Sequence, residues 1–171
     1  MDYIYVGDIV NTHGLKGELR ILSDFQYKDT IFVPGFKLYV GRQKEELIIN
    51  TYRKHKNYDM VTFIDVQGIE EAIAYKGDKV YVNRKDVKVD GYFDEDYIGL
   101  KVYVLKEYKG TVVDILKNKA NDILIIANDD KRYLIPNIKE FIEKVDLDNS
   151  KLQIYDIKGL FDENWYFNII S

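Results

Sequence analysis

The sequence of 171 residues contains no cysteine and only two histidines. Without cysteine the chain has no disulfide, no thiolate ligand for zinc and no cysteine nucleophile. The two histidines do not have the spacing of a metal site, and no third ligand cluster accompanies them. Neighbouring carboxylates such as Glu45 and Glu46 point to opposite faces of a strand, so they do not form an acid–base pair. We therefore expect a protein that is not an enzyme and that needs no metal and no cofactor.

Long apolar runs are also missing. No stretch approaches the roughly 18 uninterrupted apolar residues that a membrane-spanning helix needs. The first ten residues, MDYIYVGDIV, lack the basic segment and apolar core of a secretory signal. We expect a cytoplasmic monomer that makes no membrane contact.

The charge of the chain is unevenly divided. Residues 1–85 hold 13 basic and 12 acidic side chains, a net charge of +1, whereas residues 86–171 hold 12 and 17, a net charge of −5. Proteins that bind nucleic acid directly usually present a basic face. The acidic second half therefore favours a basic protein as its partner.

The first half alternates short β-branched and aromatic runs with turns. Gly14 and Gly17 mark the first turn, which lacks the third glycine of a dinucleotide fingerprint and the ending of a P-loop. A single helix is predicted over 69–76, with Ile69, Ala72, Ile73 and the stem of Lys76 on one apolar face. Strands are predicted over 3–10, 18–22, 37–40, 46–54, 60–64 and 79–82. So many short strands in about 85 residues indicate a small, closed β-barrel.

The second half has the same character. Further strands are predicted over 101–105, 111–116, 122–126, 131–135, 141–145 and 152–155. We therefore expect an all-β protein with one minor helix and two small β-barrels. The predicted domains are 1–84 and 92–171, joined by a polar linker over 85–91. The second domain includes an aromatic tail over 162–171, which we expect to pack against the body.

An aromatic and acidic segment opens the second domain. Four apolar side chains are interleaved with three carboxylates, and such a mixture cannot enter one core without burying unpaired charge. One interpretation is that Tyr92 and Phe93 form an exposed anchor for a basic protein, because aromatic residues dominate binding hot spots. The other is that these two rings only close the top of a barrel. The candidate partner-binding residues are Tyr92, Phe93, Asp96, Tyr97 and Ile98.

A second hypothesis is a barrel that binds RNA directly. Basic and aromatic side chains on a β-barrel can follow phosphates and stack on bases. The turn from Gly14 to Gly17 and the run from Arg53 to Lys56 would supply the contacts. The candidate residues are His13, Lys16, Arg20, Arg53, Lys54 and Lys56.

Several blocks of sequence together resemble one family. The opening VGDIVNTHGLKGELRI is followed in order by FVPGFKLYV, GIEEAIAYKGDKVYV, DYIGLKVY, GTVVDI, ANDILII, YLIP and KGLFD. In this order and over nearly the whole chain, the blocks resemble the ribosome maturation factor RimM family. The resemblance implies a six-stranded N-terminal barrel similar to those of translation factors, followed by a PRC-barrel domain.

The resemblance also implies a function. A member of this family would be a non-catalytic assembly factor that binds ribosomal protein S19 and assists maturation of the 30S head and processing of 16S rRNA. The family's aromatic pair for partner and subunit binding falls on Tyr92 and Phe93. Two departures lie nearby: Tyr97 replaces a usual leucine, and Asp94 stands where an aromatic residue is common. The expected structural turn glycines are Gly7, Gly14, Gly17 and Gly99.

Overall fold

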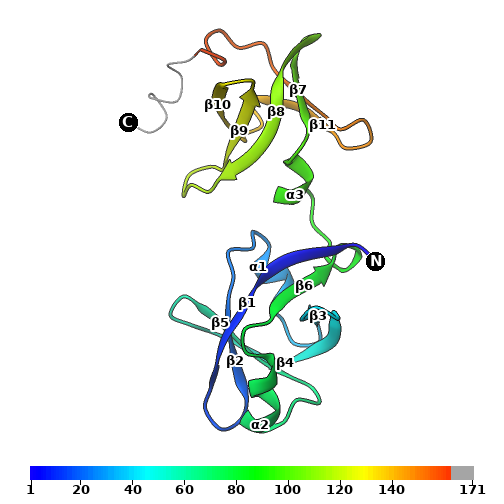
Figure 1. Cartoon of the computed structure of the whole chain (residues 1–171), viewed down its shortest axis with the longest axis vertical. Coiled ribbons are helices and arrows are strands. Elements are labelled where there is room, and N and C mark those ends of the chain that lie inside the picture. Colours follow the sequence, from blue (N-terminus) through cyan, green and yellow to red (C-terminus); the bar gives the residue numbers. More distant parts are fainter. Residues whose placement is uncertain (163–171) are drawn as a thin grey trace. The chain divides into compact units, whose positions relative to one another are not determined.

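The computed structural model describes residues 1–162 and divides the chain into two compact units. Unit 1 comprises 1–90 and unit 2 comprises 91–171. Each unit is built around its own sheet (Figure 1). The predicted aromatic tail lies outside the described residues, apart from Asp162. None of the helices within residues 1–162 is long and apolar enough to cross a membrane.

Unit 1 is a closed six-stranded barrel with the order β1-β2-β5-β4-β3-β6. The last strand, β6, pairs with both β1 and β3 and so closes the ring. All strand pairs in this barrel are antiparallel. The strands are β1 (Tyr3–His13), β2 (Glu18–Leu22), β3 (Lys37–Val40), β4 (Glu45–His55), β5 (Tyr58–Phe63) and β6 (Lys79–Asn83).

Alternation along the strands places the core of unit 1 inside the barrel. In β2, Leu19 and Ile21 are fully buried, whereas Glu18 before them and Arg20 between them are half-buried. This period of two is what a strand with one buried face requires. Asp59 is an exception, because it is a charged side chain with only 1% of its surface exposed.

The helices of unit 1 are short. They are α1 (Lys28–Ile31), α2 (Gly68–Ala72), and the 3₁₀ turns η1 (Ile73–Tyr75) and η2 (Arg84–Asp86). The single helix predicted over 69–76 is thus an α-helical turn that tightens into a 3₁₀ turn. Because three residues per turn replace 3.6, the buried face shifts along this segment. Ala72 is buried as expected, but the prediction that Ile73 faces the core is wrong, since 57% of its surface is exposed.

Unit 2 begins with α3 (Asp94–Tyr97) and continues as a six-stranded sheet with the order β10-β9-β8-β7-β12-β11. All its strand pairs are antiparallel except β12 with β7, which run parallel. The all-β prediction is therefore confirmed, while closure of this second sheet into a barrel stays a prediction. The strands are β7 (Lys101–Val104), β8 (Glu107–Leu116), β9 (Ile123–Asn128), β10 (Lys131–Pro136), β11 (Ile142–Asp146) and β12 (Lys151–Ile154).

One apolar cluster forms the core of unit 2. It joins α3 and the segment after β12 to the inner face of the sheet. Burial of this many aliphatic side chains is the main stabilising contribution in a unit of this size. The buried members are Tyr97, Leu100, Val102, Val104, Val112, Leu124, Ile126, Ile135, Leu152, Ile154 and Leu160.

Candidate partner-binding and RNA-binding surfaces

The aromatic and acidic segment folds into the short helix α3. The Oδ2 atom of Asp96 accepts a hydrogen bond of 2.8 Å from the backbone N–H of Phe93, and the N–H of Asp96 donates to the Phe93 carbonyl at 2.9 Å. A carboxylate at this position satisfies a backbone donor that the helix start leaves unpaired. Asp96 therefore has a local structural role, in addition to its predicted role in binding.

The rings of this segment are buried to different extents. Tyr97 belongs to the core of unit 2, and the half-buried Tyr92 packs against that core, with its ring centroid 6.1 Å from that of Tyr97. Phe93 is only 4% exposed, whereas Ile98 is 47% exposed. Of the two interpretations, the exposed pair is wrong for Phe93, which is buried, whereas Tyr92 keeps part of its surface exposed. Partner binding by these residues stays a prediction.

A lysine holds α3 against the sheet. The ammonium of Lys117, just after β8, lies 2.5 Å from Asp94 Oδ2 and 3.1 Å from Asp122 Oδ2. Partial burial acts to lower the pKa of Lys117, but the hydrogen bonds to the two carboxylates outweigh it and the pKa is raised. Asp94, one of the two departures from the resemblance, thus supplies an ion pair.

A second exposed apolar side chain, Val113, lies on β8. The N–H of Gly99 donates to the Val112 carbonyl at 2.8 Å, so Ile98 and Val113 are each next in sequence to one of the two bonded residues. Val113 is 45% exposed. We call these two residues the Ile98 patch. It is flanked by the three acidic residues of α3.

In unit 1 a basic surface forms where three strands meet. Arg20 on β2 and Arg53 on β4 both pair in register with Met60 on β5, so their side chains share one face of the sheet. The guanidinium of Arg20 donates to Nδ1 of His13 at 2.8 Å, and the rings of His13 and His55 lie 6.0 Å apart. The basic surface is defined as His13, Arg20, Arg53 and His55.

One carboxylate partly neutralises this surface. Arg53 donates two hydrogen bonds to Glu18, of 2.8 and 2.7 Å. These bonds lower the pKa of Glu18 and raise the pKa of Arg53. Desolvation, followed by the charges of Arg53 and Lys56, lowers the pKa of His55. The surface therefore carries two guanidinium groups beside a histidine, His55, that resists protonation.

The structure gathers part of the predicted RNA-binding set. His13, Arg20 and Arg53 meet, and they are joined by His55, which lies within the predicted run from Arg53 to Lys56. Lys54 lies instead 3.7 Å from the buried Asp59. The remaining two, Lys16 and Lys56, are exposed in the β1–β2 and β4–β5 turns. Only the pairing of β2, β5 and β4 reveals this grouping, because 33 positions separate Arg20 from Arg53 in the sequence.

A groove of about 1100 Å³ borders the basic surface. One wall is the β1–β2 turn with Leu15 and Lys16, and the other is the segment from Thr62 to Gly68. Between the two walls, Gly17 approaches Gly68: its φ is +85°, and a Cβ there would lie 2.5 Å from the Gly68 carbonyl oxygen. Gly17 thus meets both reasons for glycine, a left-handed backbone and a close approach.

The other predicted turn glycines behave differently from one another. Gly14 and Gly99 adopt positive φ, as a turn requires. The prediction of a turn at Gly7 is wrong, since Gly7 lies inside β1, at an irregularity in its pairing with β6. A Cβ at Gly7 would lie 2.5 Å from the Leu22 carbonyl oxygen, so close packing and not a turn explains the glycine.

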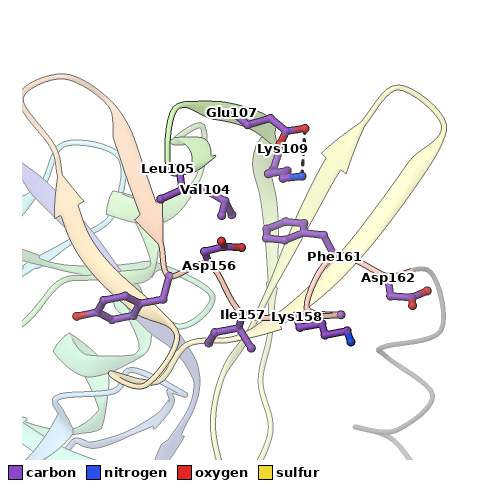
Figure 2. A pocket seen from close by; sticks show the side chains of 11 residues that line it. Val104, Leu105, Glu107, Lys109, Asp156, Ile157, Lys158, Phe161 and Asp162 are labelled. Carbon is purple, nitrogen blue, oxygen red and sulfur yellow. Dashed lines mark ion pairs between the residues drawn. The ribbon is translucent and has the colours of Figure 1, made fainter.

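Unit 2 also has a small pocket of about 350 Å³, which the sequence did not predict (Figure 2). Its walls come from the β7–β8 hairpin and from residues 155–162. Lys109 lies 3.3 Å from Glu107 and 5.6 Å from the centre of the Phe161 ring. Within residues 1–162, no three histidine or carboxylate side chains are grouped so that they could hold a metal ion.

Family models match both units. The RimM N-terminal domain matches residues 4–87, and the RimM PRC barrel domain matches residues 94–160. These two ranges fall within unit 1 and unit 2, respectively.

Curated relatives match over nearly the full length. The ribosome maturation factor RimM of Finegoldia magna is 35% identical over 94% of this chain and 100% of its own. That of an Exiguobacterium species is 37% identical over 95% of this chain and 99% of its own. A crystal structure from Pseudomonas aeruginosa, titled as a putative 16S ribosomal RNA processing protein RimM, covers 90% of this chain and 97% of its own, with 20% identity and a TM-score of 0.46. At those values the structural likeness is weak.

Proposed function

The chain belongs to the RimM family of ribosome maturation factors, and from this membership we propose that it is a non-catalytic assembly factor of the 30S subunit. It binds ribosomal protein S19 in the small-subunit head and assists head maturation and 16S rRNA processing. The observation that carries the proposal is the match to full-length relatives named as ribosome maturation factors, across both units. A cytoplasmic location follows from this role.

The Ile98 patch supports a protein contact in unit 2. It offers two exposed apolar side chains beside the carboxylates of α3. Apolar anchors beside acidic side chains favour a basic partner surface, and a basic ribosomal protein would be a partner of this kind. The net charge of −5 in the second half favours the same partner.

Calorimetric titration with S19 tests this proposal. Ile98→Asp should weaken binding by about 2 kcal/mol or more, the range of interface hot spots. Leu105→Asp is the matched control, because Leu105 is also exposed but lies in the β7–β8 turn. Equal binding by wild type and Ile98→Asp would exclude the Ile98 patch as the anchor. Absence of S19 binding by the folded wild type would contradict the proposed partner.

A second contact, with rRNA, is favoured by the basic surface. The meeting of His13, Arg20, Arg53 and His55 on one barrel face supports phosphate binding. Lys16→Glu and Lys56→Glu change exposed residues beside this surface and preserve its hydrogen bonds. Each should weaken binding to rRNA and reduce its salt dependence, by about 0.9 log unit per log unit of salt for each duplex phosphate that the variant no longer neutralises. Unchanged rRNA affinity in both variants would contradict an rRNA contact that includes the two turns beside the basic surface.

A further inference from the structure

A row of tyrosines crosses another part of the unit 1 barrel, on strands β1, β6 and β3. Tyr81 pairs in register with Tyr5 on one side and with Tyr39 on the other. Residues directly opposite one another on neighbouring strands share a face. The buried neighbours Val80 and Val82 point into the barrel, so this shared face is the outer one.

The rings touch along the whole row. Tyr5 and Tyr81 have ring centroids 5.9 Å apart, Tyr81 and Tyr3 6.4 Å, and Tyr3 and Tyr39 5.2 Å, all edge to face. Tyr39 is covered by Tyr3, but 42% of Tyr5 is exposed and Tyr3 and Tyr81 are half-buried. We call Tyr3, Tyr5 and Tyr81 the tyrosine row. Such contacts hold the rings in fixed orientations and lower the entropy cost of binding.

Two lysines accompany the row. The ammonium of Lys44 lies 4.1 Å from the centre of the Tyr81 ring and 5.8 Å from that of Tyr3. The ammonium of Lys79 lies 5.5 Å from the centre of the Tyr5 ring. Within residues 1–162 neither lysine forms an ion pair with a carboxylate. Each cation thus rests on an aromatic ring and keeps its charge available to an anion.

Hydrogen bonding fixes the orientation of the most exposed ring. The hydroxyl of Tyr5 donates to Asp8 Oδ2 at 2.8 Å, on the same strand. Burial, followed by this hydrogen bond and the charge of Asp8, raises the pKa of Tyr5 to about 12. The Tyr5 ring is therefore held in place as a neutral platform at ordinary pH.

Aromatic rings beside two positively charged lysines favour one class of ligand. A basic protein segment would be repelled by the charges of Lys44 and Lys79, and an acidic peptide has few rings to stack on the row. Single-stranded nucleic acid has both a negative backbone and a π-face on every base. We propose that the tyrosine row, with Lys44 and Lys79, is a binding site for single-stranded RNA, separate from the basic surface and the Ile98 patch.

This proposal rests partly on the proposed function, because an assembly factor of the small subunit works beside rRNA that is not yet fully folded. The row would take a short unpaired segment, without strong sequence preference. Stacking on aromatic rings accepts every base. Such a site would let the protein hold an rRNA strand while other contacts recognise protein.

Fluorescence anisotropy with a labelled oligouridylate of about 12 nucleotides, a length within the usual site sizes, tests the proposal. The double variant Tyr5→Ala with Tyr81→Ala should bind this RNA on the order of tenfold more weakly than wild type at low salt. Tyr5→Phe with Tyr81→Phe should retain most of the affinity, because the rings remain. Lys44→Ala with Lys79→Ala should weaken binding and reduce its salt dependence. Tyr108→Ala, at an equally exposed tyrosine of unit 2, is the control.

Two results would overturn the proposal. One is failure of the wild type to bind the oligonucleotide at low salt. The other is unchanged binding by the double alanine variant with a native circular dichroism spectrum. Titration of S19 into the same variants separates this proposal from the proposed function: loss of RNA binding with normal S19 binding supports the tyrosine row, and loss of S19 binding instead would assign the row to a protein contact.

Discussion

At the residue scale, the buried carboxylate of Asp59 shows how unit 1 accommodates a charge. Lys28 lies 2.9 Å from its Oδ2 atom, and the hydroxyl of Tyr52 donates to Oδ1 at 2.8 Å. Lys54 is more distant, at 3.7 Å, and its own side chain is 52% exposed. A buried charge of this kind requires its partners, because an unpaired one has a large desolvation cost.

We expect Asp59→Ala to destabilise the fold by roughly 2–4 kcal/mol, because it leaves the Tyr52 hydroxyl and the partly buried Lys28 ammonium without their acceptor. Lys54→Ala, which removes only the exposed partner, should cost less than about 1 kcal/mol. Urea denaturation followed by circular dichroism measures both. Similar losses of stability in the two variants would show that the exposed Lys54, and not Lys28 and Tyr52, accounts for the stabilisation of Asp59.

The same cluster predicts a response to alkaline pH. Burial, followed by the hydrogen bond to Asp59, raises the pKa of Tyr52 to about 12, against an ordinary value of 10.0. Between these values the unfolded chain loses the phenol proton while the folded chain keeps it, so stability falls as pH rises from about 10 to about 12. Tyr52→Phe should reduce this fall, and adding Tyr5→Phe should reduce it further. The thermal unfolding midpoint, measured from about pH 10 to about pH 12, reports this loss of stability. An equal fall of the midpoint in the wild type and both variants would show that these two tyrosines do not cause it.

At the element scale, the β1–β2 turn is fitted against the start of α2. Gly17 adopts a φ of +85° and faces the Gly68 carbonyl, whereas Gly14 adopts +74° with nothing within 4 Å of a Cβ. The N–H of Ile69 also donates to the Leu15 carbonyl at 3.0 Å. The close approach of Gly17 to Gly68 and the hydrogen bond from Ile69 to Leu15 therefore hold the turn in place as one wall of the groove.

These two glycines separate backbone strain from steric overlap. Gly14→Ala should cost about 1 kcal/mol, the strain of a left-handed alanine. Gly17→Ala should cost more than about 2 kcal/mol, because overlap with the Gly68 carbonyl is added to the same strain. Urea denaturation provides the comparison. Equal costs in the two variants would show that the turn can move away from α2 freely.

Much of the architecture could be predicted from local patterns. The strands of both units were predicted from β-branched and aromatic runs, because alternation is a strong local signal. The four-residue helices α1 and α3 were missed, since one turn is too short to show a helical period. For α3 the sequence therefore could not separate Tyr97, which belongs to the core, from Ile98, which is exposed.

Surfaces assembled from several strands could be predicted only in part. His13, Arg20 and Arg53 were predicted as basic residues near turns, but their contacts depend on the order of β2, β5 and β4. The tyrosine row was not predicted, because it exists only where β6 closes the barrel between β1 and β3. Register is set by long-range pairing, and no local pattern reports it.

At the scale of the whole molecule, each unit has its own sheet and its own buried core. Units of this size with separate cores fold independently. We expect fragments 1–90 and 91–171 to fold separately, each with the β-rich circular dichroism spectrum and dispersed amide signals of a folded domain. An unfolded fragment 91–171 beside a folded fragment 1–90 would show that unit 2 depends on unit 1.

This independence also allows two kinds of contact in one protein. In the proposed function, the acidic unit 2 would bind a protein partner through the Ile98 patch, and the nearly neutral unit 1 would bind RNA through the basic surface and the tyrosine row. A factor built in this way can hold a ribosomal protein and an rRNA strand at the same time. The proposed function requires that loss of the protein leaves small subunits incompletely matured.

The most direct test is depletion of this protein in its own cells, followed by mapping of the 16S rRNA ends in small subunits. The account predicts accumulation of precursor 16S rRNA, restored to mature ends by the wild type and by Leu105→Asp but not by Ile98→Asp. Normal 16S rRNA ends and a normal ratio of subunits in depleted cells would contradict a role in small-subunit maturation.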